Sequence, residues 1–482
     1  MRNSDTWEGS QYLVLGNHTA TLAKRYHAAA PRRPNGRMTF WQFLHAVREN
    51  SVSTYSAEDF AQDFIERRLL WRRSFVINEP NAIRHVLVDN AGNYTKSELS
   101  RRLLEPGLGR GLLTSEGETW RRHRHIMAPA FDLRSVAGYV PIMTEVTQEL
   151  LAKWDALPNL SEVEMAATMK HTTLRIISRA MFSSESDEIV EVVERGVGQY
   201  QAIVRPGLLD LLRFPLWLSR LFSRRRVIGA SDEFNKSVDR LINARGCEPD
   251  TEPKDLLARL IAARDSGMDD GMEAKEVRDQ VVTIFLAGHE TTAQALAWAW
   301  YLLSQDRAAE AKLHDELANV LAGRTPSHED LANLRYTRMV IEESMRLYPP
   351  VHTLVREAIA PDELLGHRIP VRATILIVPW LLHRKPSLWE RPDCFEPERF
   401  SPERISSRPR FAYIPFGAGP RICIGAAFAM EEALLILAMI AQRYRLHLKT
   451  GHPVEPQGLI TLRPRYGLRM VVERRAQSNR SL

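Results

Sequence analysis

Residues 416–425 of the chain read FGAGPRICIG, and this stretch decides the prediction of the fold. Gly417 and Gly419 allow backbone conformations that a β-carbon forbids, so we expect a tight turn whose N–H groups point at the sulfur of Cys423. The apolar residues 426–440 follow and predict a helix whose positive end lies next to that sulfur. Both effects favour the thiolate, which is the form of cysteine that binds metals. A lone cysteine is more often buried and inert, so the residues by themselves leave both roles open.

The composition is that of an ordinary globular protein. Of its 482 residues 44% are hydrophobic, and 65 Lys and Arg outnumber 59 Asp and Glu, for a net charge of +6. The basic residues form short scattered clusters without a nucleic-acid-binding motif beside them, so no nucleic-acid partner is expected. No apolar run reaches the length of a membrane span, and the first residues lack the features of a signal peptide. The three cysteines form no disulfide framework, which fits a cytoplasmic protein.

Apolar periodicity predicts a mostly helical protein with few strands. Proline and glycine crowd residues 348–425 and predict a long ordered coil, which in a compact protein is usually functional. Residues 1–37 are expected to be loosely ordered, and residues 38–482 to form one domain. Helices are expected over 58–71, 118–128, 135–156, 162–182, 186–204, 231–245, 254–265, 273–304, 307–321, 328–332, 336–347 and 424–443, and strands over 74–78, 374–378 and 469–472.

The longest helical pattern, 273–304, contains the segment AGHETT at 287–292. Glycine and two threonines are unfavourable inside a helix. A threonine hydroxyl can bond back to a carbonyl one turn earlier and open the backbone there, which would leave a small groove. Glu290 and Thr291 could then pass protons to a reacting group. An ordinary helix with polar residues on its surface explains the same letters, so both interpretations stay open at this point.

Two further patterns are ambiguous in the same way. Glu343 and Arg346 share one face of the helix expected at 336–347, and PERF follows at 397–400. Trp120 and Arg124 stand four residues apart on another helix. Such pairs usually lie on the surface of a protein and contribute little to its stability, although arginine also suits the bidentate binding of carboxylates.

Taken together, these segments resemble the motifs of cytochromes P450. FGAGPRICIG resembles their haem-binding loop, with Phe416, Gly419, Arg421, Cys423 and Gly425 on the fixed positions of that motif. AGHETT resembles their oxygen-activating motif. The resemblance covers roughly residues 60–475, with five motifs in the family's order. It implies a soluble, bacterial-type haem-thiolate monooxygenase. The implied fold is one triangular domain, mainly α with a small β lobe, around a long central helix.

The resemblance also implies roles for single residues. Cys423 becomes the iron ligand of haem b (iron protoporphyrin IX), and Glu290 and Thr291 become the catalytic acid and alcohol. Glu343 and Arg346 pair with Arg399 of PERF and lock the coil behind the haem, a structural role. The other cofactor-binding positions are Trp120, Arg124, Arg356, Phe416 and Arg421, of which the tryptophan and the three arginines hold the haem propionates.

The implied reaction inserts one atom of dioxygen into an apolar C–H or C=C bond. A peroxygenase driven by hydrogen peroxide and a non-catalytic haem sensor are the alternatives, and an intact Glu290–Thr291 pair argues against both. Substrate contacts are expected from 95–113, 200–222, the surroundings of Phe285, and Leu354. These segments are apolar or aromatic, which suggests a lipid-like, terpenoid or aromatic substrate.

Only 59 residues of the 482 follow Cys423, fewer than the roughly 100 of a further domain. No nucleotide-binding glycine fingerprint is present either. We therefore expect a monomer that receives electrons from a separate ferredoxin or flavodoxin and its NAD(P)H-dependent reductase. Arg121, Arg122, Arg408 and Arg410 are the expected docking residues. Residues 206–226 are apolar and end in three arginines, so they form either a mobile lid that touches a membrane or an ordinary amphipathic helix.

Overall fold

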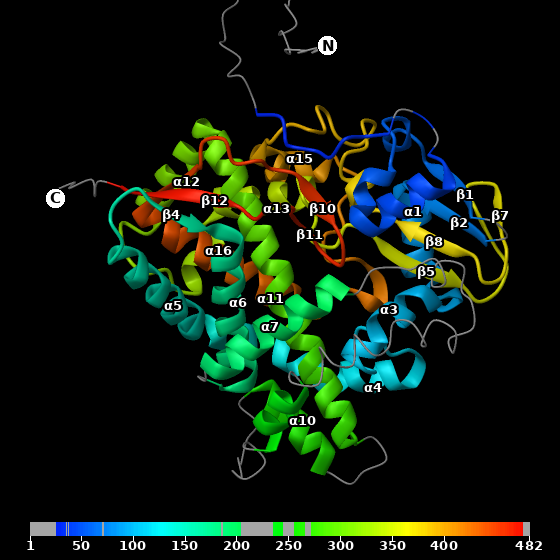
Figure 1. The fold of residues 1–482 in the computed structure, drawn as a ribbon, viewed down its shortest axis with the longest axis horizontal. Helices are drawn as coiled ribbons and strands as arrows, with labels where there is room; N and C mark the ends of the chain where they lie inside the picture. Colours follow the sequence, from blue (N-terminus) through cyan, green and yellow to red (C-terminus); the bar gives the residue numbers. More distant parts are fainter. Residues whose placement is uncertain are drawn as a thin grey trace, which may run out of the picture.

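The computed structural model describes residues 26–34, 36, 38–69, 72–184, 187–203, 235–243, 255–265 and 271–475. Helices gather on one side of the molecule and the largest sheet on the other, and the outline narrows towards α10 (Leu256–Asp265) (Figure 1). The fold is mainly α with a small β lobe, as the sequence predicts. The lid expected at 206–226 lies outside the described residues.

The helical part is built around α11 (Ala274–Gln305), which runs through the middle of the molecule (Figure 1). It packs against α6 (Met165–Phe182), α13 (Arg335–Leu347) and α16 (Ala426–Arg443). A capping box between Glu273 and Glu276 starts α11, and the side chain of Asp306 caps the helix after it. Residues 235–243 are also helical, and further helices are α1 (Phe40–Glu49), α2 (Pro80–Arg84), α3 (Glu98–Leu108), α4 (Gly117–Met127), α5 (Leu133–Asp155), α7 (Asp187–Ile203), α12 (Arg307–Val320), α14 (Pro379–Leu382) and α15 (Pro402–Ser406).

A five-stranded sheet of order β1-β2-β8-β5-β3 makes the β lobe. Its pairs are antiparallel except β2 and β8. A three-stranded sheet of order β4-β12-β9 and the hairpins β6–β7 and β10–β11 complete the strands. The bounds are β1 (Phe64–Leu69), β2 (Arg72–Ile77), β3 (Tyr94–Lys96), β4 (Ser161–Glu164), β5 (Leu354–Ala358), β6 (Asp362–Leu364), β7 (His367–Ile369), β8 (Thr374–Ile377), β9 (Tyr444–Leu448), β10 (Pro456–Gly458), β11 (Leu462–Pro464) and β12 (Arg469–Arg474).

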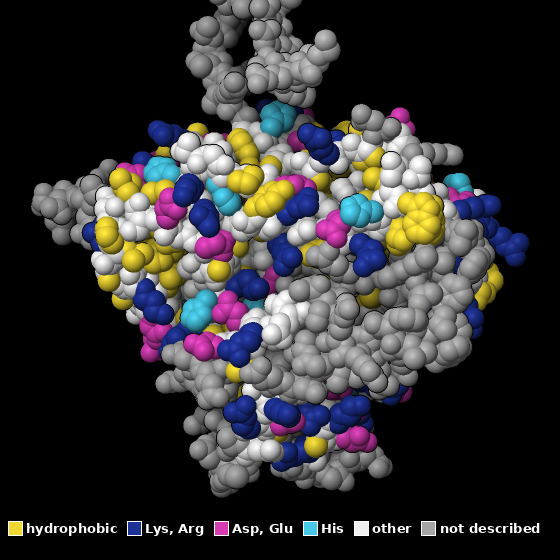
Figure 2. All heavy atoms as spheres, in the orientation of Figure 1, with side chains coloured by type: hydrophobic (Ala, Val, Ile, Leu, Met, Phe, Trp, Pro, Cys, Tyr) yellow, Lys and Arg dark blue, Asp and Glu magenta, His cyan; other side chains and the backbone are white. Residues whose placement is uncertain are grey.

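Two hydrophobic clusters follow this division. The larger joins the helices and is densest along α11 and α16, and the smaller lies beneath the sheet around Phe75, Ile375 and Ile377. On the face drawn in Figure 2, Lys and Arg lie among Asp and Glu, as the scattered basic clusters predict. Within the described ranges, none of the helices combines the length and the apolar character that a membrane span requires.

The prediction of a helix over residues 58–71 is wrong. A short 3-10 turn covers Glu58–Phe60, and Phe64–Leu69 pairs with β2 instead, with Phe64 opposite Ile77. Long-range pairing overrides local propensity there. The helices α1 and α3 were not expected, and α3 contains Pro106, which hides its pattern. The coil expected over 348–425 is also interrupted by the four short strands β5–β8.

Candidate active site

The loop before α16 is built by its glycines. Gly417 and Gly419 have φ angles of +73° and +71°, as the sequence predicts for a turn that a β-carbon forbids. A β-carbon on Gly419 would also lie 1.8 Å from the carbonyl oxygen of Leu87, so no other residue fits. The backbone N–H of Cys423 donates to the carbonyl oxygen of Phe416 at 3.0 Å and closes the loop. The cysteine is thereby fixed three residues before α16 begins.

The Cys423 side chain keeps accessible surface, yet burial among protein atoms raises the pKa of its thiol. A hydrogen bond from the Gly425 backbone and the charge of Arg124 lower the pKa only in part. These two contacts favour the thiolate, in the direction that the sequence predicts for the turn, and burial acts against them. The side chain of Cys423 is exposed and can therefore be reached by a ligand. A metal ion that binds there displaces the proton of the thiol.

Three predicted residues meet beside the loop. Trp120 on α4 lies between two guanidinium groups, with that of Arg421 at 4.1 Å and that of Arg124 at 5.9 Å from its ring. Arg124 donates to the carbonyl oxygen of Ile422 at 2.9 Å, which ties α4 to the cysteine loop. Arg421 pairs with Glu116, the residue before α4.

The sheet adds two more cations to this group. Strand pairing places Lys96 of β3 opposite Arg356 of β5. Burial, and then repulsion by Arg421, lowers the pKa of Lys96 to about 7, although Glu116 acts against the shift. Burial likewise lowers the pKa of Arg356. We call this group, Lys96 with the arginines at positions 124, 356 and 421, the cation cluster. Glu116 is the carboxylate that the structure places among these cations.

The middle of α11 also borders an accessible space. Ala287, Gly288 and Thr291 are half-buried, whereas the residues before and after them are buried. Thr291 donates to the carbonyl oxygen of Ala287 at 2.8 Å, the bond to the preceding turn that the sequence predicts. The helix nevertheless runs unbroken from 274 to 305. A β-carbon on Gly288 would meet Ile177 at 2.0 Å, so this glycine lets α6 approach.

Glu290 is adjacent to Thr291 but turns towards α6. Its carboxylate lies 3.2 Å from the ammonium group of Lys170 and accepts hydrogen bonds from Gln294 at 3.0 Å and Thr461 at 3.2 Å. Burial alone would raise the pKa of Glu290, but the Lys170 charge, then His289 and Gln294, hold it below its ordinary value. The acid of the pair is therefore ionised and anchored.

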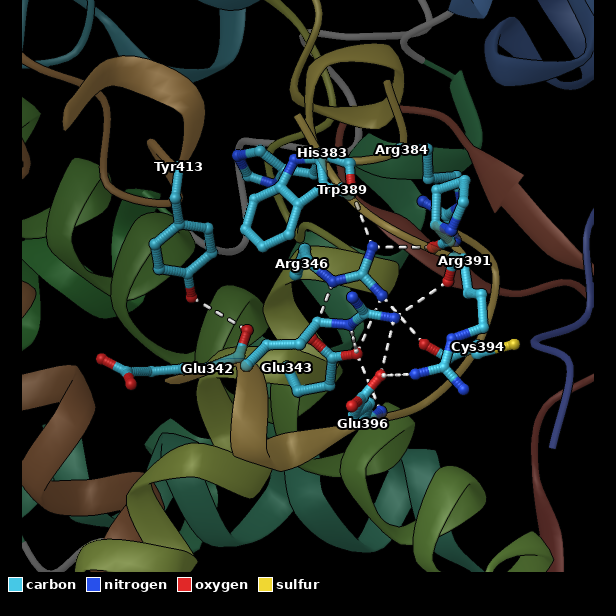
Figure 3. A network of polar contacts seen from close by, with 12 residues as sticks. Glu342, Glu343, Arg346, His383, Arg384, Trp389, Arg391, Cys394, Glu396 and Tyr413 are labelled. Atoms are coloured by element: carbon cyan, nitrogen blue, oxygen red, sulfur yellow. Dashed lines mark hydrogen bonds and ion pairs between the residues drawn. The ribbon is translucent and has the colours of Figure 1, made fainter. Parts of the chain in front are cut away.

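The predicted triad forms a buried network, and Figure 3 shows its members Glu343 and Arg346 beside Glu396. Glu343 accepts two bonds from Arg346, at 2.7 and 2.8 Å, and lies 3.3 Å from Arg399. Arg399 also pairs with Glu396 at 3.1 Å. Sequence reasoning did not identify Glu396, because it precedes the recognisable motif. Arg408 belongs to this network, since it lies 4.0 Å from the ring of Trp389 and is half-buried.

The comparisons with known proteins agree with this geometry. The family model of cytochrome P450 matches residues 31–470. The chain belongs to the cytochrome P450 family. Cyclooctatin synthase of Streptomyces melanosporofaciens is 37% identical over 83% of this chain and 86% of that protein. Cyclooctat-9-en-7-ol 5-monooxygenase of the same organism is 34% identical over 81% and 83%. The cytochrome P450DA haem domain shares the fold, with a TM-score of 0.78 at 23% identity over 94% of this chain and 99% of that domain.

Membership makes this protein an oxygen-incorporating oxidoreductase with a haem-thiolate cofactor. The residues fit such a group. The accessible sulfur of Cys423 offers the ligand. The cation cluster has an excess of positive charge, which suits the two propionates of a haem. Lys96 had no signal in the sequence, because only the pairing of β3 with β5 brings it to Arg356.

A cavity of about 1520 Å³ opens between α1, the β1–β2 hairpin, α3 and residues 458–460. Leu99, Leu103 and Leu104 line it, and they belong to the segment 95–113 expected to contact substrate. Val355, next to Leu354, lines it as well. Phe285 is instead fully buried against Phe182, with ring centres 4.4 Å apart, so it offers no surface to a substrate. Most of the segment 200–222 lies outside the described residues.

Proposed function

We propose that this cytochrome P450 is a monooxygenase that binds haem b through Cys423 and inserts one atom of dioxygen into an apolar carbocyclic substrate. The electrons come from a separate ferredoxin or flavodoxin and its NAD(P)H-dependent reductase. The observation that carries the proposal is the accessible Cys423 sulfur in a glycine-built loop beside the cation cluster. When bound, the haem supplies an electron-rich iron at which dioxygen is activated.

The chain's own groups have separate tasks in this proposal. Cys423 binds the metal, and Phe416 fixes the loop through its carbonyl oxygen. Arg124, Arg356 and Arg421, with Trp120 between two of them, orient the cofactor by charge-assisted hydrogen bonds. Glu290 and Thr291 deliver protons from within α11.

The substrate class rests on two supports. Of the 34 residues that line the cavity, 12 are leucine, valine, phenylalanine or isoleucine, and these give an apolar molecule a surface to contact beside the polar part of the lining. The relatives are named for cyclooctatin and for cyclooctat-9-en-7-ol, a cyclic unsaturated alcohol. A titration that follows the haem spin state should therefore show tighter binding of cyclooctat-9-en-7-ol than of a straight-chain fatty acid. Equal or reversed affinities would contradict the carbocyclic assignment.

Iron ligation provides the deciding experiment. The reduced, carbon-monoxide-bound protein should show the red-shifted Soret band of a thiolate ligand. Cys423→Ser should lose this band, while Cys394→Ser, at a buried cysteine 3.7 Å from His27, should keep it. Retention of the band in Cys423→Ser would overturn the proposal. Turnover with a reductase system and its absence with peroxide alone would separate a monooxygenase from a peroxygenase.

A further inference from the structure

The cavity between α1, α3 and the β1–β2 hairpin is bordered by a histidine whose hydrogen is placed by its neighbours. His352 lines the cavity shortly before β5, and its side chain is buried. Its Nε2 lies 2.9 Å from the carbonyl oxygen of Leu459, which can only accept a hydrogen bond, so Nε2 carries the hydrogen. Burial lowers the pKa of His352, and the bond to Leu459 offsets this only in part, so the ring is neutral near neutral pH. Its other nitrogen, Nδ1, is therefore an acceptor.

Thr353 supplies the hydroxyl group that meets this acceptor. Its Oγ1 lies 3.0 Å from Nδ1 of His352, so the hydroxyl donates its one hydrogen to the ring. Thr353 also lines the cavity and is half-buried. Among the described residues, none donates a hydrogen bond to this hydroxyl. At the wall of the cavity, Thr353 Oγ1 is thus a fixed hydrogen-bond acceptor that has no hydrogen to offer a ligand.

Two further hydroxyl groups of the lining have the same polarity. Ser51 donates to the carbonyl oxygen of Gly458 at 3.0 Å, and Thr54 donates to that of Ser51 at 2.7 Å. A β-carbon on Gly458 would lie 2.8 Å from Ser51 Oγ and 3.2 Å from His352 Nε2, so these groups adjoin one another. The hydroxyl groups in this part of the lining therefore offer a ligand acceptors and not donors.

The charged side chains of β1 and β2 that line the cavity are paired. Arg67 lies 3.3 Å from Asp59. Glu66 lies 2.9 Å from Arg68 and 2.8 Å from Arg73. Each of these arginines thus already has a carboxylate partner, which reduces its attraction for an anionic ligand. The lining favours an uncharged molecule, and a hydroxyl group is an uncharged group that can donate to a fixed acceptor.

We propose that Thr353 determines specificity by accepting a hydrogen bond from a hydroxyl group of the substrate, so that the carbocyclic substrate is an alcohol. This inference rests on the proposed function. A ketone of the same skeleton has no hydrogen to donate, and it would place the lone pairs of its oxygen against those of Thr353 Oγ1. A polar group that is buried without a partner costs free energy, so the ketone binds more weakly. His352 is the positioning residue that fixes the direction of the Thr353 hydroxyl.

The binding of matched alcohols and ketones provides the first test. We would follow the haem spin state during titration with cyclooctat-9-en-7-ol and with the ketone of the same skeleton, and then with cyclooctanol and cyclooctanone as a second pair. Wild type should bind each alcohol about tenfold more tightly than its ketone, because one more buried hydrogen bond is formed. Thr353→Val keeps the shape of the side chain but removes the acceptor, so this preference should disappear. Thr353→Ser should keep it.

His352→Phe provides the second test, because it should release the hydrogen of the Thr353 hydroxyl. Without the acceptor at Nδ1, Thr353 can donate into the cavity. Ketone binding should then strengthen by about tenfold, while an alcohol, which can both donate and accept, keeps its affinity. A change in the shape of the cavity alone would alter the binding of both ligands together. The matched control Thr325→Val removes an exposed hydroxyl 3.2 Å from Gln148, outside the cavity lining, and should change neither affinity.

The outcomes separate the two proposals. A wild-type protein without the thiolate spectrum would remove the proposed function and this inference with it. With that spectrum present, equal affinities for alcohol and ketone in both pairs would overturn the role of Thr353 alone. An undiminished preference for the alcohols in Thr353→Val, or a failure of both pairs to bind, would overturn it equally. Should His352→Phe fail to bind haem, the two Thr353 variants decide the question by themselves.

Discussion

Arg346 and Arg356 stand ten residues apart in the chain, and their surroundings are opposite. All five N–H groups of Arg346 are used, two on Glu343 and three on backbone carbonyl oxygens (Figure 3). Among the described residues, the guanidinium group of Arg356 makes one hydrogen bond, to the carbonyl oxygen of its neighbour Val355. Arg421, which is also cationic, lies close enough for Arg356 to lower its pKa.

The difference distinguishes two uses of a buried arginine. A guanidinium whose donors are all satisfied by protein holds the fold together, because each donor would cost free energy if it lost its partner. A guanidinium that has unused donors and lies near other cations is stabilised most when an anion binds to it. By this criterion Arg346 belongs to the scaffold, and we propose that the cation cluster, in which Arg356 has unused donors, binds the ligand.

The largest effect on stability is expected from the substitution Arg346→Lys. A lysine cannot reproduce the planar fork, so Glu343 and three carbonyl oxygens would lose partners inside the protein. Breaking a buried pair costs about 3–5 kcal/mol. We expect the free energy of unfolding, measured with urea, to fall by about that amount, or no holoprotein to accumulate.

Arg324→Lys is the matched control for this change. Arg324 pairs with Asp330 at 3.0 Å, but its side chain is 58% exposed. A surface pair contributes about 0–1 kcal/mol, so this variant should unfold nearly as wild type does. If both variants lost the same stability, saturation of donors would not be the property that matters.

Arg356→Gln should show the reverse behaviour. Removing one charge from the cation cluster relieves repulsion, so the haem-free protein should be at least as stable as wild type. Haem affinity should fall by about 10–100-fold, because a hydrogen bond to a charged group contributes about 1.5–3 kcal/mol. Titration of apoprotein with haemin measures the affinity. If the variant lost stability but kept its haem affinity, the role of Arg356 would be to stabilise the fold and not to bind the cofactor.

Both arginines could be identified from the sequence, since each stands in a recognisable motif, and so could the loop around Cys423 and the central helix. Their saturation could not, because the carbonyl oxygens that Arg346 uses come from residues 383–394, far along the chain. Lys96, Glu116 and Lys170 were missed for the same reason, as their partners lie on other elements. Phe64–Leu69 was predicted helical because only its pairing with β2 makes it a strand.

A smaller effect is expected at Glu432 of α16, a buried acid near Thr292 that joins neither group of arginines. Burial raises the pKa of Glu432 well above its ordinary value, and the Thr292 hydroxyl offsets this only in part. The folded protein therefore keeps a proton that the unfolded chain releases above about pH 4.3, and folding is weakened as the pH rises past that value.

Glu432→Gln removes this titration and keeps the shape of the side chain. Wild type should lose stability relative to the variant as the pH rises from about 4.5 to about 7, because only the unfolded wild-type chain releases this proton there. Urea unfolding of both proteins across this range measures the difference. A constant difference at every pH would show that Glu432 ionises in the folded protein as it does in the unfolded chain.

The smallest effect concerns the surface that we expect to receive the redox partner. Of the four arginines expected there, Arg408 belongs to the saturated network, and Arg122 is bound to Glu276 at 2.6 Å. Arg121 and Arg410 remain exposed. Changing these two to Glu should slow electron transfer from an acidic ferredoxin by about two- to tenfold at low salt, through the encounter rate, and the loss should shrink as ionic strength increases.

Stopped-flow reduction at several salt concentrations measures this rate, and peroxide-driven turnover, which needs no partner, should be unchanged. Arg408→Glu sharpens the comparison, because its charge would enter the network of Trp389 and Arg399 and should reduce stability and both activities together. If the exposed pair also lowered both activities, the effect would have passed through the haem site. If salt did not alter the slowing, the arginines would not act by attracting a partner, and the docking surface would have to be sought elsewhere on the molecule.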